Sequence, residues 1–260
     1  MLTWLRMPSM LTVLGAFFLV YGLLHIIRLL RNGYWYGMFR ELLSQIKRRY
    51  KLLLSYLVLI LLIITFLDKP IAQLCITYYN VYVYTVWDFI CSCAEGWFVA
   101  GVLLLLWFIC DIFVWKNASV LIRISLMSSI FAGLINGVFK FIFNRQRPSI
   151  GLDEWHFFRF FETGLHDPNT LLYAFNSMPS GHVITTIAAL VPLIMGVKQT
   201  KYKIMLATWG ILVAISRVYT MNHWLSDVLV SSILGIFIGI SCYKINAFRL
   251  KSSLHLAGTR

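Results

Sequence analysis

The chain has 260 residues, of which 60% are hydrophobic, 16% are aromatic and only 13% are charged. A soluble domain carries about 25% charged residues, so this composition excludes an ordinary soluble protein and indicates an integral membrane protein of about six or seven helical spans. The net charge of +13 is explained by the charge rule for membrane topology, so we expect the bilayer as partner and no nucleic acid.

Residues 1–51 are read as an N-terminal hydrophobic segment followed by a basic cytoplasmic stretch. Met10–Leu24 is apolar. It fits a seventh span, an interfacial helix or, less well, a cleaved signal peptide, because only Arg6 supplies a preceding positive charge and no clean cleavage site follows. The segment Arg40–Lys51 is basic and amphipathic, which predicts a helix on the cytoplasmic surface that is attracted to anionic lipid.

Residues 52–243 contain the long apolar runs that predict an all-α, polytopic membrane helix bundle. The first and fourth runs are short for a hydrocarbon core of about 30 Å, so we expect their helices to extend into neighbouring residues. Tyr78–Phe89 is aromatic but interrupted and is predicted to lie at the outer interface. The N-terminal hydrophobic segment could add one helix to the six core spans, which are Leu52–Leu67, Gly96–Trp115, Ser125–Phe143, His182–Val197, Ile204–Tyr219 and Leu225–Tyr243.

The distribution of basic residues predicts the orientation. Sixteen of the 23 lysines and arginines fall in segments that the span order places on one side, and five fall on the other. Cytoplasmic loops carry the excess of Lys and Arg, so the basic N-terminal stretch and the tail, residues 244–260, are expected in the cytoplasm. The sixteen lie in 28–51, 116–123, 198–203 and 244–260.

The five cysteines divide between core and surface. Cys110 and Cys242 fall inside predicted spans and are expected to be small core residues. Cys75, Cys91 and Cys93 fall on the predicted outer side, where Cys75 could form a disulfide with either of the other two. A zinc site built from these residues is a weaker alternative.

Three polar groups interrupt the ends of apolar runs, and the predicted topology places all three on the outer face. The first contains Lys140 and Arg147, which would share a helix face two turns apart if the helix continued to Pro148. Ionisable residues are costly in a bilayer and usually mark function there. Taken alone, the pair could instead be a snorkelling lysine and an interfacial arginine.

The second group, Pro179 to His182, has the features of a helix start. Ser180 can cap the helix, Gly181 lets the backbone approach a ligand closely, and the free amides of such an end bind phosphate readily. Taken alone, it could be an ordinary cap whose histidine lies at the interface.

The third group surrounds the predicted turn before the last span and contains Ser216, Arg217, His223 and Asp227. His223 and Asp227 are four residues apart, close enough on a helix to form a hydrogen bond. A carboxylate that accepts from one imidazole nitrogen leaves the lone pair of the other free, as a histidine nucleophile requires. A local salt bridge is the alternative for this pair alone, but the three groups together favour a phosphate-cleaving site.

With these motifs the chain resembles the type 2 phosphatidic acid phosphatase family of membrane lipid phosphatases. The family pattern is Lys, six residues, Arg-Pro; then Pro-Ser-Gly-His; then Ser-Arg, five residues, His, three residues, Asp. The resemblance covers about residues 52–243 and implies no metal and no cofactor. All three motifs match without departure, at Lys140 with Arg147-Pro148, at Pro179–His182, and at Ser216-Arg217 with His223 and Asp227.

The resemblance implies a role for each matching residue. His223 would attack phosphorus and form a phosphohistidine, Asp227 would orient His223, and His182 would protonate the leaving oxygen and later activate water. Three cations and a helix end could supply the positive charge that a metal often supplies to phosphoryl transfer. The phosphate oxygens would be held by Lys140, Arg147, Arg217, Ser180 and the backbone amide of Gly181.

The substrate is expected to be a lipid phosphate that enters from the outer leaflet. Family substrates include polyprenyl diphosphates, lipid A, phosphatidylglycerol phosphate and phosphatidic acid, and we favour the first two slightly. The compact length resembles bacterial members, which implies the inner membrane with the site toward the periplasm or cell exterior. The aromatic run Trp155–Phe161 could be a lid, a rim or an interfacial anchor. Phosphoryl transfer between lipids and lipid-phosphate transport remain alternatives, haloperoxidase chemistry is disfavoured, and the oligomeric state is open.

Overall fold

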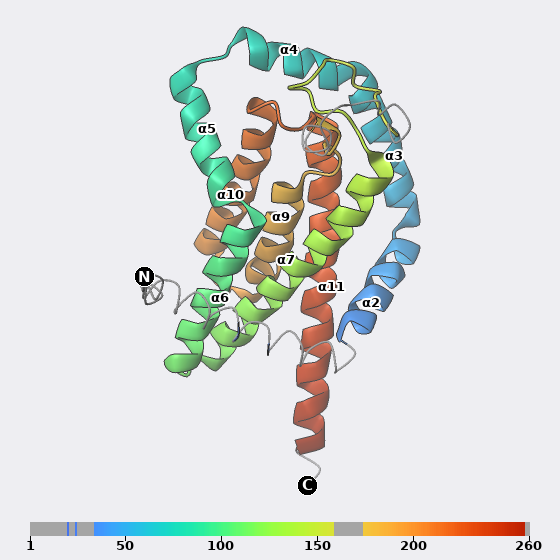
Figure 1. The fold of residues 1–260 in the computed structure, drawn as a ribbon. Helices are drawn as coiled ribbons and strands as arrows, with labels where there is room; N and C mark the ends of the chain where they lie inside the picture. The colour runs from blue at the N-terminus through green and yellow to red at the C-terminus, as the bar shows by residue number, and fades with distance from the viewer. Residues whose placement is uncertain (1–19, 21–23, 25–33, 159–173, 258–260) are drawn as a thin grey trace, which may run out of the picture.

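The computed structural model describes residues 20, 24, 34–158 and 174–257, and every regular element in these ranges is a helix (Figure 1). The Met10–Leu24 alternatives therefore lie almost entirely outside the described residues. The predicted all-α membrane bundle is confirmed. In chain order the helices are α2 (Tyr34–Arg48), α3 (Tyr50–Ile63), the π-helix η1 (Ile64–Asp68), α4 (Lys69–Thr77), α5 (Val81–Cys93), α6 (Gly96–Ile112), α7 (Lys116–Phe143), α9 (Gly181–Gly196), α10 (Thr200–Tyr219) and α11 (Leu225–Ala257).

Three stretches are long and apolar enough to cross a membrane: Tyr50–Thr77, Lys116–Phe143 and Leu225–Asn246. α5 and α6 pass the same test as a pair bent by 54°, and α9 is a shorter apolar helix. The count of six core spans stays a prediction. The first and third predicted spans are longer in the structure than in the sequence pattern, since α7 starts at Lys116 inside an expected loop.

The first span continues through a π-turn into α4. Pro70 lies in the first turn of α4 and lacks the N–H that would continue the α-helical ladder, which explains an irregular turn directly before it. Figure 1 shows α3 rising along the bundle and α4 passing over its end. The last residue of the π-helix η1 is Asp68, which is buried and lies at the start of α11.

The segment Tyr78–Phe89 is mostly helical, and its place at the outer interface stays a prediction. Asn80 begins α5 as its cap, because its side-chain oxygen accepts hydrogen bonds from the backbone N–H groups of Tyr82 and Val83 at 2.9 and 3.3 Å. α5 packs along α10, and a bend at Ala94 leads into α6. All five cysteines are free thiols, so the suggested disulfide is absent, and Cys91 donates to Ser216 instead.

α7, α9 and α11 form the centre of the bundle, and α10 packs against α9. Glycines on α11 allow the close contact with α9: a Cβ at Gly235 would lie 2.9 Å from the carbonyl oxygen of Ile184, and one at Gly239 would lie 2.6 Å from Cβ of Val191. This contact fixes how far α9 is shifted along the axis of α11. Their amino-terminal ends therefore lie at the same end of the bundle (Figure 1).

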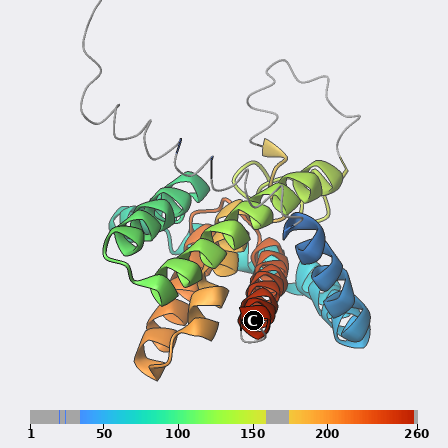
Figure 2. The same ribbon diagram turned by 90° about the horizontal axis from the view of Figure 1, so that it is seen from below.

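α2 and α3 lie on one side of α11, and α10 lies on the other (Figure 2). α2 comes from the predicted basic N-terminal stretch and packs directly on α11. Gln45 donates to Ser241 at 2.7 Å and both residues are buried, which joins the two helices. α11 continues as a helix through Ala257, past the start of the predicted basic tail at residue 244.

Candidate active site

The three polar groups lie at the end of the bundle that α4 covers, where the chain leaves α7, enters α9 and turns from α10 to α11 (Figure 1). Backbone hydrogen bonds join the three segments. The N–H of Arg147 donates to the carbonyl of Ala174 at 2.9 Å, and that of Ser149 donates to the carbonyl of Met221 at 3.0 Å. The segment that follows α7 is thus joined by hydrogen bonds to the segment before α9 and to the α10–α11 turn.

Lys140 and Arg147 do not share a helix face, as the sequence suggested they might with a longer helix. α7 ends at Phe143 because Asn144 adopts a left-handed conformation with φ 37°, which asparagine tolerates better than most residues. Arg147 is instead held from the opposite side: its Nη1 donates to the side-chain oxygen of Asn222 at 3.1 Å and to the carbonyl oxygen of that residue at 3.3 Å. The α10–α11 turn therefore positions this guanidinium.

Gly181 faces the last turns of α7. A Cβ at this position would lie 3.2 Å from Nδ2 of Asn136 and 3.9 Å from Nζ of Lys140. The helix start and the lysine are therefore within reach of one ligand. Asn136 was not expected from the sequence, and only its position one turn before Lys140 could have pointed to it.

Several buried polar atoms at this end lack a hydrogen-bond partner among the described residues. They include Oγ of Ser180, Nε of Arg217 and Oδ1 of Asn136. Buried polar groups are almost always paired, so each of these atoms is a candidate contact for a group other than the described residues. Ser180 stands at the N-cap position of α9, but its hydroxyl makes no capping bond and remains available. Two of the three atoms are donors, which favours an anion.

His223 is almost fully buried in the turn between α10 and α11. Its Nδ1 lies 2.5 Å from the carbonyl oxygen of Ser177. A carbonyl can only accept, so Nδ1 carries the proton and Nε2 keeps its lone pair. Burial, followed by the positive charges of Arg217, Arg147 and Lys140, holds the pKa of His223 well below its ordinary value of 6.5. The imidazole is therefore neutral and nucleophilic at neutral pH.

Asp227 does not form the direct hydrogen bond to His223 that the spacing predicts. Its Oδ2 lies 3.9 Å from Nδ1, because the Ser177 carbonyl is closer and takes the Nδ1 proton. Oδ2 instead accepts from the hydroxyl of Ser177 at 2.5 Å and from the backbone N–H of Trp224 at 3.0 Å. Ser177 thus contacts His223 with its carbonyl and Asp227 with its hydroxyl, so the carboxylate acts on the imidazole through this residue.

Arg145 is the central residue that sequence reasoning missed. Its side chain is fully buried between two carboxylates: Nη2 lies 2.8 Å from Oδ2 of Asp68, and Nη1 lies 2.5 Å from Oδ1 of Asp227. Nη1 also donates to Ser226 at 2.7 Å, and Nε and Nη2 donate to the carbonyl of Glu154 at 3.1 and 2.6 Å. One sequence feature could have pointed to this ion pair: Asp68 is an acidic residue at the end of the first apolar run, where a charge needs a partner.

The described part of the aromatic run borders an apolar groove. Trp155, Phe157 and Phe158 line it together with Met178 and side chains of α3 and α11, and its volume is about 490 Å³. A second apolar groove of about 420 Å³ shares Leu53, Ile233 and Leu234 with the first and extends it toward α2. The joined groove starts two residues from Ser180 and runs along α11, away from the polar site.

Comparison with known proteins gives a family and a fold. The model of the PAP2 superfamily matches residues 122–251. No curated protein matches. Among solved structures, a transmembrane PAP2 type phosphatidylglycerolphosphate phosphatase from Bacillus subtilis superposes with a TM-score of 0.57 at 21% identity, covering 76% of this chain and 95% of that one. LpxE from Aquifex aeolicus gives a TM-score of 0.48 at 21% identity and covers 68% and 95%.

Proposed function

Because this chain belongs to the PAP2 superfamily, we propose that it is a membrane lipid phosphatase that hydrolyses a phosphomonoester or diphosphate of a membrane lipid. The single observation that carries the proposal is the environment of His223. Its neutral imidazole keeps the lone pair of Nε2 free and lies close enough to Arg217, Arg147 and Lys140 for their positive charges to lower its pKa. The same end of the bundle holds buried donors that have no partner among the described residues. This combination suits a phosphorus electrophile that carries negative charge.

In the proposed reaction, Nε2 of His223 attacks phosphorus and the bond to the leaving oxygen breaks, which gives a phosphohistidine. The negative charge of the bound phosphate stabilises a protonated His182, at the start of α9, which then donates its proton to the leaving oxygen. It then takes a proton from water, whose oxygen attacks phosphorus and releases inorganic phosphate and free His223. The phosphate oxygens are held by Lys140, Arg147, Arg217, the hydroxyl of Ser180 and the N–H of Gly181, so the proposal needs no metal.

Asp227, Arg145 and Asp68 are proposed as positioning residues. Ser177 donates to Asp227 and accepts from His223, so the carboxylate fixes the peptide group that orients the imidazole. Arg145 in turn holds Asp227 against Asp68 on the first span. The resemblance assigned Asp227 an orienting role; these contacts support it, although by an indirect route.

The hydrocarbon chain of the substrate is proposed to lie in the groove along α11. Val230, three residues after Asp227 on the same helix, lines the groove, so a lipid held by its phosphate can place its tail there. Aromatic side chains at the groove entrance suit the level of lipid headgroups. We favour a bacterial envelope lipid, with polyprenyl diphosphate and lipid A slightly ahead of phosphatidylglycerol phosphate and phosphatidic acid. The proposed location is the inner membrane, with the site toward the periplasm or exterior and the C-terminus cytoplasmic.

The test is phosphate release by the purified protein in detergent with EDTA, using these four lipids as substrates. His223→Ala should abolish release, whereas Lys201→Gln, an exposed change at the other end of α10, should leave it unchanged. The pH profile of activity in His182→Gln should lack the basic limb. This variant should also accumulate an acid-labile phosphoprotein when hydrolysis of the phosphohistidine is the step that is slowed most.

Each alternative gives a different result. A phosphorylated lipid product in place of inorganic phosphate would indicate phosphoryl transfer. Movement of intact lipid across vesicles without release would indicate transport. Release that persists in His223→Ala would contradict the proposed nucleophile.

A further inference from the structure

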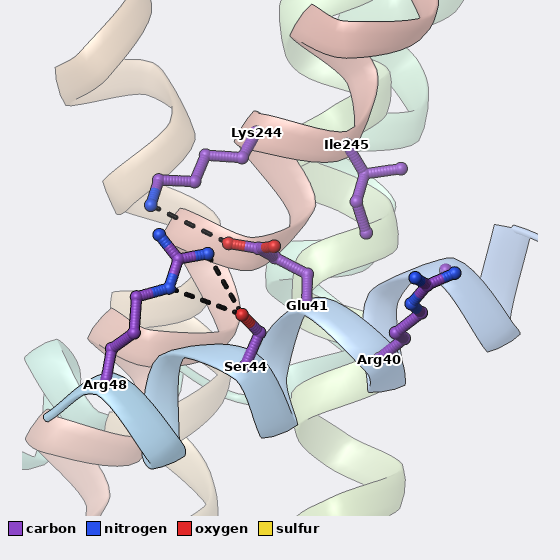
Figure 3. A pocket seen from close by; sticks show the side chains of 7 residues that line it. Arg40, Glu41, Ser44, Arg48, Lys244 and Ile245 are labelled. Atoms are coloured by element: carbon purple, nitrogen blue, oxygen red, sulfur yellow. Dashed lines mark hydrogen bonds and ion pairs between the residues drawn. The ribbon is translucent and has the colours of Figure 1, made fainter. Parts of the chain in front are cut away.

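At the end of the bundle opposite the candidate active site, α2 and α11 border an open cavity of about 700 Å³. Figure 3 shows its polar side chains, which come from four positions on α2 and one on α11. The helices that form it are joined firmly, because Met38 and Gln45 of α2 are buried against Cys242 and Ser241 of α11. The polar residues that line the cavity are Arg40, Glu41, Ser44, Arg48 and Lys244.

The cavity has an excess of positive charge and ordered donors. Three basic residues, Arg40, Arg48 and Lys244, line the cavity together with a single acid, Glu41. Nε and Nη2 of Arg48 donate to Oγ of Ser44 at 3.3 and 2.9 Å, and Nζ of Lys244 lies 3.7 Å from Oε1 of Glu41. In Figure 3 the charged ends of Arg48 and Lys244 point to the same side of the cavity. Two like charges brought together there would be stabilised by an anion that both can contact.

The surroundings of the cavity indicate a lipid. α2 exposes Tyr36, Phe39, Leu43 and Ile46 beside its basic residues, which is the pattern of a helix at a membrane surface. The three cationic side chains of the cavity therefore lie next to the apolar face of α2, as residues that contact lipid headgroups do. Most of the described lysines and arginines lie in the segments at this end, as expected for the leaflet rich in anionic lipid.

We propose that this cavity binds the phosphate of an anionic lipid in the leaflet opposite the active site. Arg48 supplies a planar fork for two phosphate oxygens, and Lys244 and Arg40 supply further charge. α2, which supplies four of the five polar residues of the cavity, precedes the residues matched by the family model, whereas Lys244 lies within them. The proposal does not depend on the lipid phosphatase activity.

The probe is short-chain phosphatidylglycerol, a phosphodiester, added to the full-length protein in a neutral detergent and measured as bound lipid by native mass spectrometry. Arg48→Gln with Lys244→Gln should weaken binding by about tenfold or more, since both charge-assisted contacts are lost. Lys198→Gln with Lys201→Gln removes the same charge on two exposed residues, one just before α10 and one in its first turn, and this variant should bind as the unmodified protein does. Glu41→Gln removes the single acid and should tighten binding.

Equal binding by the two double variants would overturn the proposal, as would equal binding of short-chain phosphatidylcholine by the unmodified protein. Inorganic phosphate that displaces the lipid at equal concentration would show a free-phosphate site and overturn the assignment to a lipid. Phosphate release from the proposed substrate should stay within about twofold in Arg48→Gln with Lys244→Gln. Failure of lipid binding can therefore be told apart from failure of the lipid phosphatase proposal.

Discussion

Removal of Arg145 is expected to be the most destabilising single change in this protein. The guanidinium is the bridge between Asp68 and Asp227, both fully buried, at 2.8 and 2.5 Å. Arg145→Met keeps a similar volume but leaves two buried carboxylates without their cation. Removing one partner of a buried ion pair lowers the free energy of unfolding by about 3–5 kcal/mol. Arg145 also donates hydrogen bonds to Ser226 and to the carbonyl oxygen of Glu154, so we expect a loss in the upper part of that range. Such a loss is a large share of a total stability of about 5–15 kcal/mol.

The assay is thermal and denaturant unfolding in detergent for Arg145→Met, Asp68→Asn and the double variant. The double variant should lose much less than the sum of the single variants, because neutral Asp68→Asn removes one of the stranded charges. Asp68→Asn alone should lower kcat by about 10- to 100-fold with little change in KM, since Asp68 positions Asp227 without contact to phosphate. A cost below about 1 kcal/mol for Arg145→Met, or strict additivity, would refute the reasoning.

Three further outcomes are expected. The acid limb of kcat/KM should lie below pH 6.5, because the neutral imidazole of His223 is the reactive form and its lowered pKa delays protonation as the pH falls; a limb at or above 6.5 would contradict this. Gly181→Ala should weaken competitive inhibition by inorganic phosphate by about tenfold, since its methyl group would lie 3.2 Å from Nδ2 of Asn136 and narrow the pocket; an unchanged inhibition constant would speak against a phosphate at this helix start. Gly239→Ala should cost about 1–3 kcal/mol in unfolding, because its Cβ would meet a side chain of α9 at 2.6 Å, whereas Gly101→Ala has open space and should cost nothing or stabilise α6; equal effects would exclude the packing explanation.

The sequence by itself determined the class of the protein and the ends of helices where its polar groups lie. Apolar runs with few charges predict membrane helices, and a charge in such a run is costly enough to be conspicuous. Pro179 to His182 predicts a helix start from local spacing alone, and α9 begins at Gly181. These properties depend on residues a few positions apart, so they can be read without knowledge of the packing.

The tertiary structure decided which groups meet. Asp68 and Arg145 are 77 residues apart, and Arg145 and Asp227 are 82 apart, so only the π-turn after α3 and the irregular segment after α7 bring them together. The same holds for Ser177, whose carbonyl displaces Asp227 as the partner of His223 because a single Nδ1 proton goes to the nearer acceptor. Helical spacing predicts contacts along one helix, but it carries no information on which turn of another segment lies closer.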